Sequence, residues 1–125
     1  MAAPYKDSMQ TCKSEQMKIL DHDTYKIQAT RKGSQTTYTI GFGDEPADNT
    51  DLAQLVSKAT YEIPSELHGS VALITGKASL PISYGLAHNL AHYHTAVAVY
   101  DPKLQGFVVA ITHDPRYTLG LLIQP

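Results

Sequence analysis

The alternation of hydrophobic and polar residues predicts a β-hairpin near the start of the chain. Over residues 18–30 apolar side chains recur at every second position for part of the segment, a pattern that favours a half-buried strand. A turn-forming sequence, Arg31-Lys32-Gly33-Ser34, comes next. The following segment, QTTYTIGF at residues 35–42, is rich in β-branched and aromatic residues and predicts the partner strand.

Three short, nearly continuous apolar runs lie further along, at residues 71–74, 96–100 and 107–111. Runs of this length between turns suit strands that are buried on both faces, as in an α/β layer. A last short strand is predicted over residues 119–124. Because a helix separates the first two runs, the pattern predicts a strand-helix-strand unit with a hairpin on each flank.

Two amphipathic helices are predicted. The first covers residues 49–59, where apolar side chains recur with helical spacing. The second follows Ser79, which suits an N-cap, and has Pro81 in its first turn. At 100° per residue the second helix has an apolar stripe toward the sheet and a stripe facing outward. The apolar stripe comprises Ile82, Leu86, Leu90 and Tyr93, and the outward one Tyr84, His88 and His92.

The spacing of His88 and His92 matches two zinc ligands on a helix, but a zinc-protease signature needs glutamate where the chain has Asn89. That class of enzyme is therefore disfavoured. The outward histidines meet solvent, a ligand or another subunit, and an ordinary surface or interface role stays open for each.

Composition narrows the class of protein. A chain of 125 residues supports one domain, which we place at residues 18–125 after a flexible N-terminal extension at 1–17. The single cysteine rules out an internal disulfide framework, and no apolar run reaches the ~20 residues of a membrane span. We therefore expect a cytoplasmic protein with no membrane partner. A formal net charge of −2 argues against a general nucleic-acid coat protein but allows a small anionic ligand.

The turn Gly76-Lys77-Ala78-Ser79 follows a predicted strand and opens a helix. Backbone N–H groups, the positive end of the helix dipole and the Lys77 ammonium would converge there and suit a phosphate group. The spacing is not that of a Walker A loop, and an ordinary strand-to-helix turn remains the alternative. Asp101 ends the neighbouring parallel strand at the same edge, which is where open α/β sheets bind ligands.

Chain direction divides the candidate residues between two edges of the sheet. The carboxyl edge holds Gly76, Lys77, Ser79, Asp101 and Lys103, and the amino edge holds His92, His94 and His113. The strand between them covers about 17–20 Å, so His92 and Asp101 are not expected to touch within one subunit. Clustered imidazoles suit a transition metal or acid–base chemistry, although His113-Asp114-Pro115-Arg116 also fits a plain turn.

A family resemblance rests on four matching segments: Gly76-Lys77 through Pro81-Ile82, Ala91-His92-Tyr93-His94, Val97 to Lys103, and Ile111-Thr112-His113. With Tyr100-Asp101-Pro102-Lys103 at its centre, the pattern resembles the small CRISPR-associated ring nucleases of the third Csx/Crn family, from type III systems. The resemblance covers about residues 70–124 well and the segment before it only by order of elements.

This resemblance implies a compact Rossmann-like (CARF-like) mixed sheet with two helices that forms a homodimer. It implies cleavage of cyclic tetra-adenylate, the second messenger of type III CRISPR defence, to linear di-adenylates with manganese, which switches off antiviral signalling. It also implies action on short oligo-A RNA, but not on DNA. Two dimers sandwich the ligand in such proteins, so we expect a tetramer or filament around it.

The resemblance also implies roles for individual residues. His92, Asp101 and Lys103 match catalytic positions, and manganese ligands are expected from Asp101, His92 and His113. Ligand binding falls to Gly76, Lys77, Ala78, Ser79 and Tyr84. Lys77 and Lys103 stand where the family has arginine, which keeps the charge but loses the bidentate fork.

Two other functions stay open. One is a sensor or oligo-A RNA-binding or deadenylating domain, possibly part of a larger fusion, that holds cyclic oligoadenylate without cutting it. The other is an α/β dimerisation module whose histidines only form an interface.

Overall fold

The fold is a seven-stranded sheet whose spatial order is the order of the sequence, β1-β2-β3-β4-β5-β6-β7. The structure is a computed structural model that describes residues 15–22, 25–44 and 62–125. The strands are β1 (Glu15–Asp21), β2 (Tyr25–Lys32), β3 (Gln35–Phe42), β4 (Gly69–Gly76), β5 (His94–Asp101), β6 (Gly106–Thr112) and β7 (Leu122–Ile123). A 3-10 turn, η1 (Ser65–Leu67), and one helix, α2 (Leu80–Leu90), complete the described elements.

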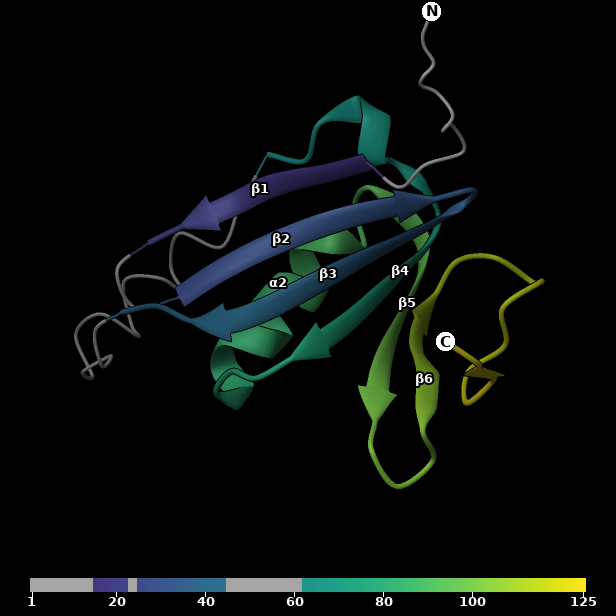
Figure 1. The fold of residues 1–125 in the computed structure, drawn as a ribbon. Helices are drawn as coiled ribbons and strands as arrows, with labels where there is room; N and C mark the ends of the chain where they lie inside the picture. Colours follow the sequence, from purple (N-terminus) through teal and green to yellow (C-terminus); the bar gives the residue numbers. More distant parts are fainter. Residues whose placement is uncertain (1–14, 23–24, 45–61) are drawn as a thin grey trace, which may run out of the picture.

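The middle of the sheet is parallel and its flanks are antiparallel (Figure 1). β3, β4 and β5 run parallel, and α2 connects the last two of them. β2 pairs antiparallel with β3 on one side, and β6 pairs antiparallel with β5 on the other. The predicted strand-helix-strand unit with a hairpin on each flank is therefore confirmed.

The predicted Rossmann-like (CARF-like) architecture with two helices is wrong. A Rossmann-like sheet reverses its strand order at a switch point and carries helices on both faces. Here every strand pairs with its neighbours in sequence, and the described part of the chain has one α-helix. The first predicted helix, at residues 49–59, lies outside the described residues. A dimer is not shown by the single chain.

The segment 18–30, predicted as one strand, contains parts of two. β1 and β2 pair antiparallel, with Asp21 opposite Lys26 at the reversal. Apolar residues of both strands pack on the same core cluster, so each strand carries apolar residues within the predicted segment. β1 also begins at Glu15, before the predicted start, whereas β7 has only two of the residues predicted at 119–124.

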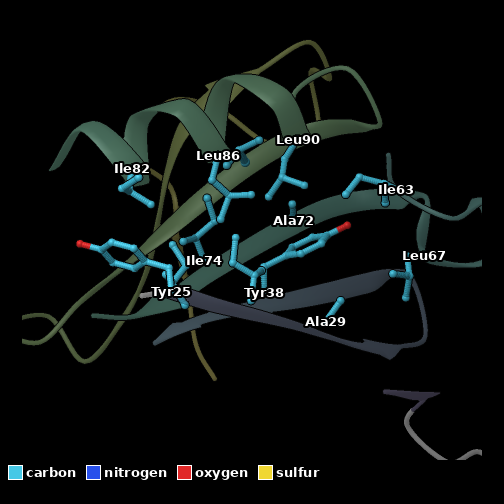
Figure 2. Packing of buried hydrophobic residues seen from close by; sticks show 13 residues of the cluster. Tyr25, Ala29, Tyr38, Ile63, Leu67, Ala72, Ile74, Ile82, Leu86 and Leu90 are labelled. Carbon is cyan, nitrogen blue, oxygen red and sulfur yellow. The ribbon is translucent and has the colours of Figure 1, made fainter. Parts of the chain in front are cut away.

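The main core lies between the sheet and α2 (Figure 2). The predicted apolar stripe of α2 is confirmed, since Ile82, Leu86 and Leu90 are buried against the sheet. From the sheet, Tyr38 and Ile74 point up toward them. The outward stripe is also confirmed, because Tyr84, His88 and His92 are exposed.

A second core cluster lies on side chains of β4, β5 and β6 that the first cluster does not contain. Val71, Leu73, Ala96 and Ala98 alternate along β4 and β5 with residues of the main core. Tyr117 and Ile123 of the C-terminal segment pack against this cluster. Burial of β4 and β5 in both clusters explains their continuous apolar runs. In the described part of the chain, no helix has the length and hydropathy to cross a membrane.

Candidate functional site

Backbone geometry fixes the turn that leads from β4 into α2. Gly76 has φ +111°, and a Cβ placed there would lie 1.9 Å from the Ile40 carbonyl oxygen. The next residue, Lys77, donates its backbone N–H to that same oxygen at 2.9 Å. Only glycine fits this conformation, so the turn is anchored to the end of β3. The Lys77 side chain is left exposed.

Ser79 occupies the N-cap position of α2, as predicted, but its side chain makes no capping hydrogen bond. Its carbonyl accepts the Ser83 backbone N–H at 3.1 Å, while its hydroxyl oxygen is buried without a hydrogen-bond partner among the described residues. Leu80 and Pro81 form the first turn, where the missing N–H of proline costs no helical bond.

An apolar groove of about 680 Å³ opens between α2 and the ends of β4, β5 and β6. Four of the five predicted ligand-binding residues line it, namely Gly76, Lys77, Ala78 and Tyr84; the fifth, Ser79, does not. Leu80, Val99 and Ile111 supply apolar walls. The Tyr84 side chain is 70% exposed at its rim. The size is in the range of small-ligand sites.

The hairpin between β5 and β6 carries Asp101 and Lys103. One carboxylate oxygen of Asp101, Oδ1, accepts the backbone N–H groups of Lys103 at 2.8 Å and Leu104 at 3.3 Å. Asp101 therefore shapes the turn that presents Lys103, whose side chain is exposed. Pro102 lines the groove, which places this hairpin beside the predicted ligand-binding turn.

His92 and His113 lie near the opposite ends of the strands. His92 follows α2, two residues before β5 begins, and is exposed. His113 follows β6, and its backbone N–H donates to the Thr95 carbonyl at 2.7 Å. The segment after His113 also forms the plain turn that the sequence allowed. Its Asp114 carboxylate bonds the Arg116 guanidinium at 2.7 Å, and these hydrogen bonds hold the pKa of Asp114 below its ordinary value.

The structure keeps the predicted catalytic residues apart within one chain. β5 is eight residues long, from His94 to Asp101, so its ends are separated by about 23 Å. Asp101 and Lys103 lie at one end, and His92 lies beyond the other. The predicted manganese set of Asp101, His92 and His113 is likewise divided, and across the described ranges no three His, Cys, Asp or Glu side chains gather.

His94 does not belong with the two exposed histidines, although the sequence placed it at the same edge. Its side chain is 4% exposed, and its Nε2 lies 2.7 Å from the Tyr38 hydroxyl. Burial lowers the pKa of His94 to about 4 and raises the pKa of Tyr38 above its ordinary value. His94 is therefore a neutral core residue, and the reason is that β5 turns its first side chain inward.

His88 is a residue that the sequence-based site left out. It is exposed, lines the groove, and contacts His92, with ring centroids 5.3 Å apart. The sequence signal for His88 is its spacing of four residues from His92. Sequence spacing predicts that two helical residues meet, but it does not predict a groove beside them.

Comparison with known proteins gives one family. Residues 46–124 match the family model described as CRISPR-associated protein (Cas_csx3), so the match covers the turn, α2, β5, β6 and both edges described above. No curated protein matches the chain.

Proposed function

Because this chain belongs to the Cas_csx3 family of CRISPR-associated proteins, we propose that it is a ring nuclease that cleaves cyclic tetra-adenylate to linear di-adenylates. Loss of this second messenger of type III CRISPR defence would switch off antiviral signalling. Short oligo-A RNA is a second substrate of the same chemistry, since it offers the same bases and phosphodiesters.

The groove carries the proposal, because it combines the contacts that an oligoadenylate needs. Tyr84 offers an exposed aromatic ring at the rim, and adenine stacks on such rings. Lys77 in the turn and Lys103 in the neighbouring hairpin are exposed cations suited to phosphate groups. Apolar walls exclude water from a bound base.

The division between the two edges supports an active site completed by a second copy. In one chain His92 lies about a strand length from Asp101 and Lys103. A copy facing the groove edge with its histidine edge would bring the three residue types together on one ligand. We therefore propose that homodimers associate into a tetramer or filament around cyclic tetra-adenylate.

In the proposed reaction the ribose 2′-OH attacks its adjacent phosphodiester. A bond forms from the 2′ oxygen to phosphorus and the bond to the 5′ oxygen breaks. The 5′ oxygen takes a proton from water and leaves as a hydroxyl, and the proton that His92 has removed returns to the solvent. His92 removes the proton from the 2′-OH, and Lys103 neutralises the extra negative charge of the phosphorane. Lys77 and Tyr84 hold the neighbouring phosphate and base so that the attacking oxygen is aligned.

The carboxylate and imidazole groups predicted as ligands are of types that manganese accepts. They lie too far apart in one chain, so they could hold the ion only between subunits. Manganese prefers carboxylate oxygen and accepts imidazole, and a carboxylate has about four acceptor positions, of which the Asp101 turn uses two. Asp101 from one chain and His113 from another would hold the ion. His92 would be a third ligand only in place of its role as the base, because a metal-bound imidazole has no free lone pair to accept a proton. Bound there, the metal would supply positive charge for the phosphate oxygens.

Incubation of the chain with cyclic tetra-adenylate, with and without manganese, tests the proposal through separation of the products. We expect linear di-adenylate in the presence of the metal. Activity per subunit should rise steeply with enzyme concentration, because the site requires association. An intact ring at all enzyme and metal concentrations would rule out the nuclease function.

The His92→Ala variant tests the assigned base. Single-turnover cleavage should fall by at least about a hundredfold, the value of a positioned acid–base group, while binding of the ring is retained. The matched control is His22→Ala, which removes an imidazole next to β1, far from α2 in sequence. Equal cleavage by His92→Ala and the parent chain contradicts the assignment.

A non-cleaving sensor is the second candidate, and the separation of the edges favours it for an isolated chain. The groove, Lys77 and Lys103 are available in one copy, whereas His92 lies beyond the other end of β5 from Lys103. Tight binding of cyclic tetra-adenylate without any product, even at concentrations where the chain associates, would identify the sensor. Failure to bind any oligoadenylate would instead favour the dimerisation module.

A further inference from the structure

Two histidines contact each other on the exposed side of α2. His88 lies in the last turn of the helix, and His92 lies in the turn that continues it, where its backbone N–H donates to the Asn89 carbonyl at 3.1 Å. Their ring centroids are 5.3 Å apart, and both residues are exposed. We propose that His88 and His92 form a two-imidazole site for a divalent transition-metal ion of the zinc, nickel or cobalt class.

The distance between the rings fits chelation. A tetrahedral ion with metal–nitrogen bonds of about 2.1 Å holds the centroids of two imidazole ligands about 5 Å apart. The rings now meet at an interplanar angle of 86°, edge to face. Chelation therefore needs rotation about the Cβ–Cγ bond of one ring, and this torsion is broad for histidine. The backbone does not have to move.

The position on the helix also favours a cation. The last turn of α2 carries the partial negative charge of the helix dipole, which stabilises positive charge nearby. Asn89, between the two histidines in sequence, is buried, whereas both imidazole-bearing residues are exposed. The remaining coordination positions face outward and are open to water or to an anionic ligand.

Imidazole nitrogen selects the class of metal. In the described part of the chain no carboxylate joins these two histidines in a metal-binding group. Two imidazoles suit zinc, nickel, copper or cobalt, whereas manganese prefers oxygen ligands. The site therefore differs from the manganese site proposed between subunits, although His92 is a candidate ligand of both. It stands whether or not the chain cleaves cyclic tetra-adenylate, since it requires only one copy.

Calorimetric titration of the untagged chain with nickel chloride and zinc chloride tests the site. The background is Cys12→Ser, because a thiolate is also a ligand for these ions. We expect a single saturable site whose affinity falls at least about tenfold in His88→Ala or His92→Ala, since losing either imidazole removes the intramolecular second bond. Imidazole NMR signals of these two histidines should shift before those of the other four.

A register control keeps the number of histidines constant. The double variant Tyr84→His/His88→Ala places imidazoles at positions 84 and 92, two helical turns apart and about 12 Å along the axis, where one ion cannot join them. Tyr84 is exposed, so the helix should form normally, and circular dichroism checks this. The proposal is overturned if this variant binds nickel as tightly as the parent, or if the parent binds no better than His88→Ala/His92→Ala.

Discussion

At the amino edge of the parallel strands several polar side chains form hydrogen bonds within the chain, although His92 and His113 stay exposed. At the carboxyl edge Lys77 and Lys103 are exposed beside an apolar groove. At the amino edge the Arg31 guanidinium donates to the carbonyls of Glu66 and His68 at 2.7 and 2.6 Å. The Thr36 hydroxyl donates to the Leu67 carbonyl at 2.7 Å, and Tyr38 pairs with His94. These bonds tie η1 and the start of β4 to the hairpin of β2 and β3.

The carboxyl edge is held by backbone geometry instead of side-chain pairs. Gly76 fixes the turn through its contact with Ile40, and Asp101 bonds the backbone of its own hairpin. Lys77, Lys103 and Tyr84 are exposed. A turn fixed by its backbone can leave its side chains exposed and available for a ligand, while comparable polar groups at the opposite edge form hydrogen bonds within the chain. Four measurements test this contrast.

The largest effect is expected for Gly76→Ala. The added methyl group meets the Ile40 carbonyl oxygen at 1.9 Å in a positive-φ conformation, so the turn or β3 must shift. We expect a loss of at least about 3 kcal/mol in the free energy of unfolding, measured by urea denaturation. Gly41→Ala is the matched control, because a Cβ there meets nothing within 4 Å. Equal stability of the two variants would show that the turn is not fixed by its backbone.

The next effect is a dependence of stability on pH, caused by His94 at the amino edge. The unfolded His94 imidazole takes up a proton near its ordinary pKa of 6.5, whereas the folded one stays neutral down to about 4. Protons therefore favour the unfolded chain, and stability that is complete above pH 6.5 falls between there and pH 4, by up to about 3 kcal/mol. Urea titrations at stepped pH measure the slope. His94→Gln should lose this part of it, and His113→Gln, at an exposed position, should keep it.

A smaller effect is expected for Tyr38→Phe. Removing the hydroxyl leaves the buried His94 Nε2 without its partner at 2.7 Å, which should cost about 1–2 kcal/mol of unfolding free energy. Tyr84→Phe removes an exposed hydroxyl and should change little. In the double variant Tyr38→Phe/His94→Gln the losses should not add, since both remove the same bond. Additive losses would mean that the pair is not coupled.

The smallest change in the free energy of unfolding is expected at the carboxyl edge. Lys77→Gln alters an exposed side chain and should shift the unfolding free energy by less than about 0.5 kcal/mol. Binding of cyclic tetra-adenylate, measured by calorimetry, should weaken about tenfold if the ammonium contacts a phosphate. Arg31→Gln should do the reverse and lower stability with unchanged binding. The contrast between the two edges would be wrong if Lys77→Gln lowered the free energy of unfolding and bound cyclic tetra-adenylate as tightly as the parent chain.

The sequence predicted the elements that have a local signal. Within the predicted turn segment 31–34 only Gly33 and Ser34 form the turn, because Arg31 and Lys32 end β2. The full extent of β3 followed from β-branched and aromatic residues, and both faces of α2 followed from helical spacing. The apolar runs of β4, β5 and β6 predicted buried strands, and chain direction predicted that His92 and Asp101 lie at different edges. Each of these features depends on residues that are neighbours in sequence or on short connections between consecutive elements.

Tertiary structure alone decided the remaining features. The strand order and the parallel pairing of β3 with β4 depend on contacts between distant segments, so a Rossmann-like sheet was predicted where a sequential one formed. His92 and His94 are two residues apart, yet one is exposed and the other buried against Tyr38. Whether a side chain faces solvent or the core depends on which strand and helix cover it, and the local sequence does not determine which elements these are. The groove and its wall of Val99 and Ile111 arise for the same reason.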